Sequence, residues 1–282
     1  NGRLDEKALE FAFINVIERH EVLRTVIKDH EGKAYQYLLK PDQWKLEILN
    51  GRGWRQDKLD NSIRKEIESP FDLSVDYMIR ATLIEVADET NILVITLHHI
   101  ATDAWSIDIL INEVNELYQS YKKGKSIGLK LLTVQYADYA LWQRDFLQGD
   151  AYETKINYWV NKLNDTLTLE LPYDFKRQIR RSFKGETLHF NIENKLGFNL
   201  IAYSKKMGVT PFMTLLAGLN ILLSRYSAQE DICIGTSIAN RGTLETENLI
   251  GFFVNTIALR TNIRQNDTFG DLLEKVKKTT TE

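Results

Sequence analysis

The chain has 282 residues, of which 43% are apolar and 27% are charged, and it carries a net charge of −3. This is the composition of an ordinary globular protein, so it argues against a disordered, collagen-like or coiled-coil chain, and the weak negative charge argues against a dedicated nucleic-acid binder. At roughly 150 residues per domain, the length predicts about two domains or one large domain with two lobes.

The first half of the chain alternates between helical and strand patterns. Helices are predicted where apolar residues recur every three or four positions, and strands where β-branched and aromatic residues form short runs. In chain order, the predicted elements are a helix over residues 5–19, strands over 22–27, 34–39 and 45–49, a helix over 56–69, strands over 77–86 and 91–98, and a helix over 106–124. Because residues 92–97 are apolar on both faces, they are expected to form a central, buried strand.

The second half of the chain is expected to contain more helix than strand. The predicted elements are helices over residues 133–147 and 152–163, a strand over 188–192, a helix over 212–226 with Pro211 in its first turn, strands over 232–238 and 253–260, and a helix over 268–278. Residues 171–185 have no clean period and contain five basic residues, which indicates an exposed loop or a phosphate-binding segment. The predicted class is α/β in two lobes, residues 1–148 and residues 149–282, with the boundary between Gly124 and Gly149.

Cysteine content and hydropathy restrict the setting in which the chain works. Cys233 is the only cysteine, so it cannot close an internal disulfide, and a reducing compartment, the cytoplasm, is expected. The most apolar stretch, residues 212–223, is shorter than the roughly 20 residues of a membrane-spanning helix. No membrane association is therefore expected.

Two adjacent histidines lie at the end of the strand predicted over residues 91–98. Side chains alternate along a strand, so His98 and His99 are expected to point to opposite sides. A neutral imidazole can accept a proton from an amine, an alcohol or a thiol, and Asp103 is near enough to brace the loop or to cap the next helix. The residues alone leave two interpretations open, a catalytic site and two core histidines bonded to the backbone. A metal site is not predicted, because adjacent histidines point apart and no third ligand has zinc-like spacing.

Residues 98–106 resemble the H-H-x-x-x-D-G-x-S signature of the condensation domains of nonribosomal peptide synthetases. Other segments resemble motifs of the same family in the family's order, and these are residues 19–25 (RHEVLRT), 69–73 (SPFDL), 136–144 (YADYALWQR), 235–241 (GTSIANR) and 250–256 (IGFFVNT). The resemblance covers essentially the whole chain. It implies a two-lobed chloramphenicol-acetyltransferase-like fold of mixed sheets flanked by helices, with the active site in a tunnel between the lobes.

The resemblance also implies a reaction and its partners. Condensation domains form an amide bond between a donor acyl or aminoacyl thioester and the α-amine of an acceptor aminoacyl thioester. Both substrates arrive on the phosphopantetheine arms of upstream and downstream peptidyl carrier domains, next to an adenylation domain in the same multidomain chain. The resemblance implies no directly bound cofactor, while the charge, the hydropathy and the histidine spacing argue against nucleic acid, a membrane and a metal as partners.

The resemblance assigns roles to the histidine motif. His99, the second histidine, is the expected catalytic residue, and it either removes the amine proton or positions the amine in the transition state. His98 and Asp103 belong to the same catalytic motif in a structural role. Asp103 is expected to form a buried ion pair with an arginine of residues 19–25, and of the two arginines there, Arg19 and Arg24, the expected partner is Arg19.

Five further residues are candidates for the lining of the substrate tunnel, and they are Ala104, Trp105, Ser106, Tyr136 and Asn255. Ala104 stands where the family motif has glycine, which would allow a positive φ or a close approach by the substrate. The spacing of Tyr136 in its predicted helix also fits a packing role. Asn255 fits a hydrogen bond to a crossing loop as well as it fits a tunnel wall.

Other functions fit the motifs less well. An epimerization domain shares both histidines but places a tryptophan after the motif serine, whereas here Trp105 precedes Ser106. A cyclization domain replaces both histidines by aspartates, and a coenzyme-A-dependent acyltransferase would share only the histidine motif. A non-catalytic condensation-like module that recruits carrier or tailoring partners stays open, because Ala104 departs from the motif.

The family's earliest motif and its last two motifs are absent from this sequence. The chain is therefore expected to be an incomplete condensation domain, shortened at both ends. Because strands 232–238 and 253–260 would then lack part of their covering, we expect an isolated chain to be nearly inactive and to self-associate.

Overall fold

The computed structural model describes residues 2–175 and 185–282. The chain divides into two compact units, the first comprising Asn1–Gln148 and Ala239–Asn255, the second Gly149–Ile238 and Thr256–Glu282. In this division the chain passes from the first unit to the second after Gln148, and residues 239–255 return to the first unit. The division into lobes 1–148 and 149–282 stays a prediction. The basic residues of the predicted loop, between positions 176 and 184, lie outside the described residues.

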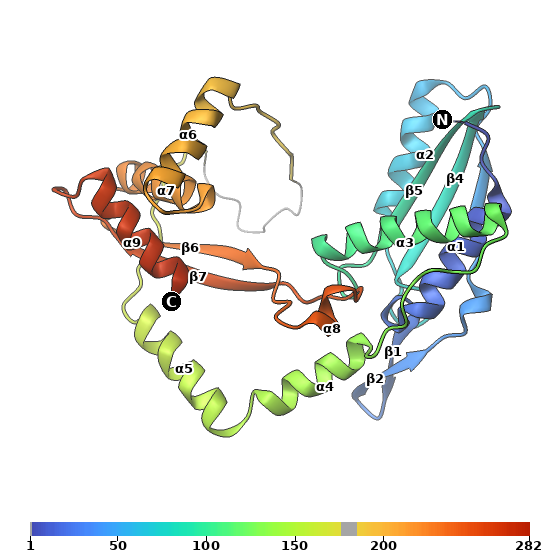
Figure 1. The fold of residues 1–282 in the computed structure, drawn as a ribbon, viewed down its shortest axis with the longest axis horizontal. Helices are drawn as coiled ribbons and strands as arrows, with labels where there is room; N and C mark the ends of the chain where they lie inside the picture. The colour runs from blue at the N-terminus through green and yellow to red at the C-terminus, as the bar shows by residue number, and fades with distance from the viewer. Residues whose placement is uncertain (1, 176–184) are drawn as a thin grey trace. The chain divides into compact units, whose positions relative to one another are not determined.

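A three-stranded sheet forms the centre of the first unit (Figure 1). Its order is β3-β4-β5, with β3 (Glu47–Asn50) parallel to β4 (Ile79–Ala87), and β4 antiparallel to β5 (Thr90–Leu97). The three strands lie within two or three residues of their predicted bounds. The hairpin β4–β5 ends immediately before the two histidines, so this sheet determines where they emerge.

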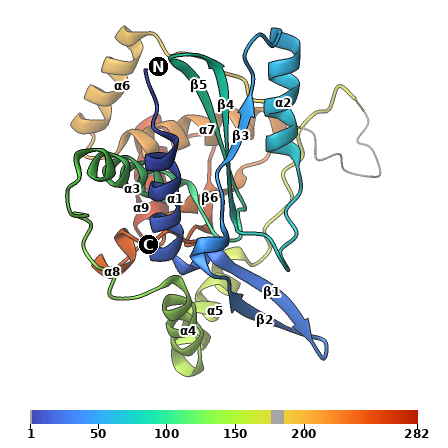
Figure 2. The ribbon, with the colours of Figure 1, turned by 90° about the vertical axis from the view of Figure 1, so that its right-hand side faces the viewer.

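Helices cover both faces of this sheet (Figure 2). Ile79, Ala81 and Leu83 alternate along β4 and join the cluster of buried side chains to which α1 and α3 contribute. On the other face, Ile84 packs with Leu59 of α2. The three helices, all close to their predicted bounds, are α1 (Glu6–Arg19), α2 (Gln56–Glu68) and α3 (Ala104–Lys123).

The prediction that residues 92–97 form a central strand is wrong, because β5 lies at one end of the sheet order in the described part of the chain. The strand is apolar on both faces for another reason. Ile95 and Leu97 pack against the cluster beneath α1 and α3, whereas Ile92 and Val94 pack with the residues of α2. Helices on both faces therefore produce the same sequence pattern as a central position.

The first unit also contains a separate strand pair and several short elements. The predicted hairpin forms as β1 (Thr25–His30) and β2 (Lys33–Leu38), but residues 21–24 adopt a 3₁₀ turn, in which Leu23 is buried. The amide N–H of Leu23 donates to the carbonyl of His20 at 3.0 Å, which closes the turn directly after α1. The other short elements of this unit are the 3₁₀ turn Pro41–Gln43, α4 (Tyr136–Phe146) and α8 (Leu244–Glu247).

The second unit consists of a strand pair and helices. Its core contains Leu216 of α7, Leu259 of β7 and Leu272 of α9. The chain order is α5 (Gly149–Leu163), α6 (Asn194–Lys206), α7 (Pro211–Ser227), β6 (Asp231–Ile238), β7 (Asn255–Asn262) and α9 (Phe269–Thr281). β6 pairs with β7, and the guanidinium of Arg260 joins them through an ion pair with Asp231 at 2.6 Å.

Two features of the second unit differ from the sequence prediction. Residues 188–192 form no strand, and Leu188 and Phe190 are 86% and 78% exposed, because nothing described in this part of the chain pairs with them. Helix α6 was not predicted. In contrast, α7 begins at Pro211 as expected, where the missing N–H of proline breaks no helical hydrogen bond.

Among the described residues, no single helix is long and apolar enough to cross a membrane. The helices α6 and α7 reach that length and apolar character only when they are taken together, and the chain bends by 104° between them.

Candidate active site

The two histidines occupy a tight turn between β5 and α3. The amide N–H of Ala101 donates to the carbonyl of His98 at 3.0 Å, which closes the turn. The His98 ring packs edge-on against Phe71, and the His99 ring packs edge-on against Phe252. The two neighbouring imidazoles thus meet different surroundings, as their alternation predicts.

His99 presents a nitrogen that can accept a proton. Its side chain is exposed, and its Nδ1 lies 2.6 Å from the carbonyl oxygen of Thr102. A carbonyl oxygen can only accept, so Nδ1 must be the donor, and the neutral ring carries its proton on Nδ1. Nε2 then keeps its lone pair, which is the state required to accept a proton from an attacking nucleophile.

His98 is held in the opposite tautomer. Its Nδ1 accepts a hydrogen bond from the amide N–H of Ile100 at 3.1 Å, so the neutral ring carries its proton on Nε2. The ring is half-buried beside Phe71. Of the two histidines, only His99 therefore combines exposure with an unprotonated Nε2.

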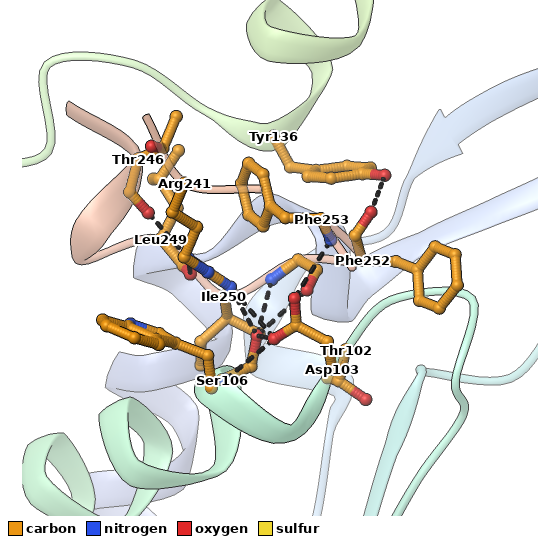
Figure 3. A network of polar contacts seen from close by, with 12 residues as sticks. Thr102, Asp103, Ser106, Tyr136, Arg241, Thr246, Leu249, Ile250, Phe252 and Phe253 are labelled. Atoms are coloured by element: carbon orange, nitrogen blue, oxygen red, sulfur yellow. Dashed lines mark hydrogen bonds and ion pairs between the residues drawn. The ribbon is translucent and has the colours of Figure 1, made fainter. Parts of the chain in front are cut away.

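Asp103 anchors the start of α3 from a buried position (Figure 3). Its Oδ1 accepts hydrogen bonds from the amide of Ser106 at 3.0 Å and from the Ser106 hydroxyl at 2.8 Å, so it is the N-cap of the helix. Its Oδ2 accepts from the amide of Phe253 at 3.1 Å. Burial raises the pKa of Asp103, but these hydrogen bonds and the charge of Arg241 outweigh it and hold the pKa below its usual value.

The cation that neutralises Asp103 is Arg241, whose side chain is 1% exposed. Nη2 of Arg241 lies 3.0 Å from Oδ1 of Asp103, and Nη1 donates to the carbonyls of Thr246 and Leu249 at 2.6 and 2.7 Å. The guanidinium also lies 4.0 Å above the ring of Phe253. One side chain thus joins the histidine turn to the segment of residues 239–255 (Figure 3).

The predicted ion pair between Arg19 and Asp103 is wrong. Nε of Arg19 instead lies 2.9 Å from Oε1 of Glu113 in the middle of α3, and Oε2 of Glu113 accepts from Nε2 of His20 at 2.8 Å. Nδ1 of His20 accepts in turn from the amide of Ile250 at 3.3 Å. Glu113 lies almost three helical turns after Asp103 in α3. Because Arg19 stands at the end of α1 beside the middle of α3, it reaches Glu113 and not Asp103.

Arg24 also has a local role. Its Nη1 donates to the carbonyl of Leu39 at 2.9 Å, and its Nη2 lies 3.3 Å from a carboxylate oxygen of Glu21. These contacts connect the 3₁₀ turn after α1 to the end of β2. Arg24 therefore supports the β1–β2 hairpin.

Tyr136 and Gly251 meet in close packing at the start of α4. A Cβ added to Gly251 would lie 2.3 Å from Cδ2 of Tyr136 and 2.6 Å from Cε2 of Phe253, so only glycine fits there. The Tyr136 hydroxyl donates to the carbonyl of Phe252 at 2.8 Å. Burial raises the pKa of Tyr136, so the hydroxyl keeps its proton and remains a donor.

The other tunnel candidates occupy distinct places. Ala104 is exposed at the first position of α3 and has no positive φ, so a glycine is not required there for backbone reasons. Trp105 is half exposed and donates its indole N–H to the carbonyl of Glu247 at 3.1 Å. Ser106 is buried and accepts from the amide of Gly251 at 3.1 Å. Asn255 is exposed at the first residue of β7.

A hollow of about 260 Å³ adjoins the histidine turn. Met78 and Ala101 are the buried residues of its lining, and Ile100, next to His99, also lines it. The described residues include no group of three histidine, cysteine or carboxylate side chains arranged to hold a metal ion. The donors present suit hydrogen bonding and proton transfer.

Two functional residues escaped the sequence prediction. Arg241 is the only charged residue of the segment 235–241, which was singled out as a familial motif without a role for its arginine. Glu113 shares the buried face of α3 with Ser106, Leu110 and Leu117. A charged residue on such a stripe predicts a buried partner, and this signal would have found it.

Comparisons with known proteins agree with the motifs. A profile of the family described as "Condensation domain" matches residues 1–282. A linear gramicidin synthase polypeptide of Brevibacillus parabrevis is 39% identical over 284 residues, which cover 99% of this chain and 6% of that protein. Malpinin synthetase of Mortierella alpina is 37% identical over 282 residues, covering 99% and 4%. The chain thus spans a small part of these curated relatives.

Solved structures share the fold. The X-domain from teicoplanin biosynthesis matches with a TM-score of 0.89 and 27% identity, over 99% of this chain and 63% of that chain. The first condensation domain of the calcium-dependent antibiotic synthetase matches with a TM-score of 0.82 and 17% identity, over 99% and 66%. The epimerization domain from the third module of tyrocidine synthetase B matches with a TM-score of 0.87 and 19% identity, over 100% and 64%. The chain therefore spans about two thirds of these structures.

Proposed function

Because the chain belongs to the condensation-domain family of nonribosomal peptide synthetases, we propose that it catalyses formation of an amide bond between two carrier-bound thioesters. The observation that carries this proposal is the state of His99. It is exposed on a hydrogen-bonded turn, its Nδ1 donates to the carbonyl of Thr102, and its Nε2 can accept a proton.

The reaction assigns His99 a defined step. The α-amine of the acceptor attacks the carbonyl carbon of the donor thioester, a C–N bond replaces the C–S bond, and the donor's phosphopantetheine thiol leaves. The proton lost by the amine passes to Nε2 of His99 and from there to the departing thiolate. General base catalysis of this kind contributes about 10²- to 10⁴-fold to a rate.

The chain's other motif residues serve this step by holding the turn. Asp103, buried and paired with Arg241, fixes the first turn of α3. His98 accepts from the amide of Ile100 and orders the residue next to His99. Trp105 and Ser106 attach the same turn to residues 247 and 251.

The wider architecture of the proposal follows the family. The proposal assigns the chain to a chloramphenicol-acetyltransferase-like fold, in which the substrates reach His99 through a tunnel. Upstream and downstream peptidyl carrier domains supply both substrates on their phosphopantetheine arms, next to an adenylation domain of the same chain in the cytoplasm. The chain itself then needs no bound cofactor.

A second candidate is a module that recruits partners without catalysis. The X-domain from teicoplanin biosynthesis is 27% identical to this chain, and a solved complex of that X-domain contains OxyB. Ala104, in place of the motif glycine, is also compatible with this alternative. Recruitment predicts that carriers or tailoring partners bind while no amide forms.

A single-turnover assay tests the proposal with the intact synthetase and with donor-loaded and acceptor-loaded carriers. The wild type is expected to form dipeptidyl carrier, detected by mass spectrometry, and His99→Gln is expected to lose about 100-fold or more of that rate. The matched control is His30→Gln, at the exposed end of β1, whose ring contacts Tyr35. It should keep the wild-type rate.

Each contrary result has its own meaning. A wild-type protein that binds both carriers but forms no dipeptide would favour recruitment. A His99→Gln protein as fast as the wild type would remove His99 from the reaction. A product whose donor residue has inverted, without amide formation, would favour an epimerization domain.

A further inference from the structure

The peptide group that joins Phe252 to Phe253 is held from both sides. Its carbonyl oxygen accepts the hydroxyl of Tyr136 at 2.8 Å, and its N–H donates to Oδ2 of Asp103 at 3.1 Å (Figure 3). The orientation of this peptide plane is therefore determined by two side chains from α4 and from the start of α3. The plane in turn limits the directions in which the Phe252 side chain can leave the backbone.

The Phe252 side chain leads directly to the proposed catalytic histidine. Its ring centroid lies 5.1 Å from that of His99, with an angle of 89° between the planes, which is the favourable edge-to-face arrangement. The hydrogen bond from Nδ1 of His99 to Thr102 fixes one point of the imidazole but leaves the ring free to tilt about that bond. The contact with Phe252 restricts this tilt.

Tyr136 is itself placed within narrow limits. Its ring occupies the space that a Cβ at Gly251 would need, and it meets the ring of Phe253 edge-on at 5.1 Å. Since burial keeps the phenol protonated, the donor is present throughout the working pH range. The hydroxyl of this tunnel candidate is thus engaged with the backbone of Phe252.

We propose that Tyr136 is a positioning residue, whose hydroxyl holds the Phe252 peptide so that the Phe252 ring keeps the His99 imidazole in the orientation in which its Nδ1 donates to Thr102. This inference rests on the proposed function only for its effect on rate. Its effect on the imidazole is a property of the folded chain and is measurable without substrate.

The test compares Tyr136→Phe with Tyr139→Phe, the same chemical change one helical turn later. The Tyr139 hydroxyl accepts from Gln143 and Asn240 and has no described hydrogen bond to Phe252. In the full chain labelled with ¹⁵N-histidine, the wild-type His99 should show a protonated Nδ1 and an unprotonated Nε2, assigned by loss of these signals in His99→Gln. Tyr136→Phe should shift both resonances toward the average of the two tautomers, and Tyr139→Phe should leave them unchanged.

The kinetic arm of the test uses the single-turnover and steady-state assays with loaded carriers. Tyr136→Phe is expected to lower kcat about 10- to 100-fold with KM unchanged, because a displaced general base affects the chemical step and not substrate binding. Phe252→Leu removes the ring while the backbone carbonyl remains for Tyr136, and it should reproduce both effects even if Tyr136→Phe folds poorly.

The outcomes separate this inference from the proposed function. Wild-type ¹⁵N resonances and kcat in Tyr136→Phe would overturn the positioning role, and so would unchanged resonances in Phe252→Leu. If the wild type forms no dipeptide, amide formation is rejected, whereas a tautomer shift in Tyr136→Phe still supports the positioning of His99.

Discussion

Two buried carboxylates, one at the N-cap of α3 and one near its middle, bind different parts of the chain. Asp103, 4% exposed, caps the first turn and binds Arg241 and the amide of Phe253. Glu113, 6% exposed and near the middle of the helix, binds Arg19 and His20 from the end of α1. One carboxylate therefore holds a segment more than 130 residues later in the chain, and the other holds two helices together.

The two networks meet on consecutive residues of one segment. The amide of Ile250 donates to His20 of the Glu113 network, and the amide of Gly251 donates to Ser106 of the Asp103 network. The difference between them is their distance from the histidine turn. Asp103 lies four residues after His99 and shares its turn, whereas Glu113 lies almost three helical turns further along. Disturbing the first network should therefore affect both stability and chemistry, and disturbing the second mainly stability.

The largest expected effect is that of Arg241→Met. It leaves Asp103 buried without its counter-ion and removes the donors to the carbonyls of Thr246 and Leu249. Breaking a buried ion pair in this way lowers the free energy of unfolding by about 3–5 kcal/mol. Urea unfolding followed by tryptophan fluorescence measures it, and the rate of amide formation should fall with it.

The matched variant for the other network is Glu113→Gln. Glutamine still accepts from Arg19 or His20 and Arg19 is partly exposed, so we expect a loss below about 3 kcal/mol and a preserved rate per folded molecule. If Glu113→Gln lost more unfolding free energy than Arg241→Met, the Glu113 network and not the Asp103 network would contribute more to stability.

Helix α3 and the histidine turn before it could be predicted from the sequence. Local patterns were sufficient for α3, because the Asp103 cap, the apolar stripe and the left-handed Gly124 at the C-cap all lie within the helix or next to it. The turn that carries His98 and His99 was predicted for the same reason. The tautomer of His99 was not, because it depends on a carbonyl three residues away whose direction only the folded turn defines.

The partners of both carboxylates could not be predicted from spacing. Asp103 and Arg241 are 138 residues apart and Arg19 and Glu113 are 94 apart, so spacing along the chain could not identify either pair. The strand predicted over residues 188–192 failed for a related reason, since a β-rich run forms a strand only where another strand pairs with it. Long-range pairing decided each of these cases.

The next effect tests the segment that the networks share. Gly251→Ala forces a methyl group against the rings of Tyr136 and Phe253, and overpacking of this kind lowers the unfolding free energy by about 1–3 kcal/mol. Gly251 lies between Ile250, whose amide donates to His20, and Phe252, whose ring contacts His99. The ¹⁵N signals of both His20 and His99 should therefore change. A change confined to His99 would show that the two networks are independent at this segment.

Acid should weaken the Asp103 network in a defined direction. The pKa of Asp103 is lowered in the folded chain from about 3.9 in an unfolded one, so its stabilisation is complete above about pH 4 and is lost as the pH falls through the folded-state value. The difference in unfolding free energy between wild type and Asp103→Asn should therefore be constant near neutral pH and shrink below about pH 4. A difference that persists unchanged as the pH falls well below that value would contradict a charged Asp103.

The smallest expected effect is that of Ala104→Gly, which restores the family residue next to Asp103. Ala104 is exposed and adopts helical backbone at the first position of α3. Glycine at that position lowers helix stability by less than about 1 kcal/mol, and the cap is supplied by Asp103 and not by residue 104. The Asp103 network should survive, and the His99 resonances should be those of the wild type.

The same variant also tests the rate. Since the backbone at residue 104 does not need a positive φ, close approach by a substrate is the remaining reason for glycine, and the variant should form amide at least as fast as the wild type. If Ala104→Gly lost as much unfolding free energy as Arg241→Met, residue 104 itself would stabilise the turn. The stability of the turn could then not be attributed to the Asp103 network.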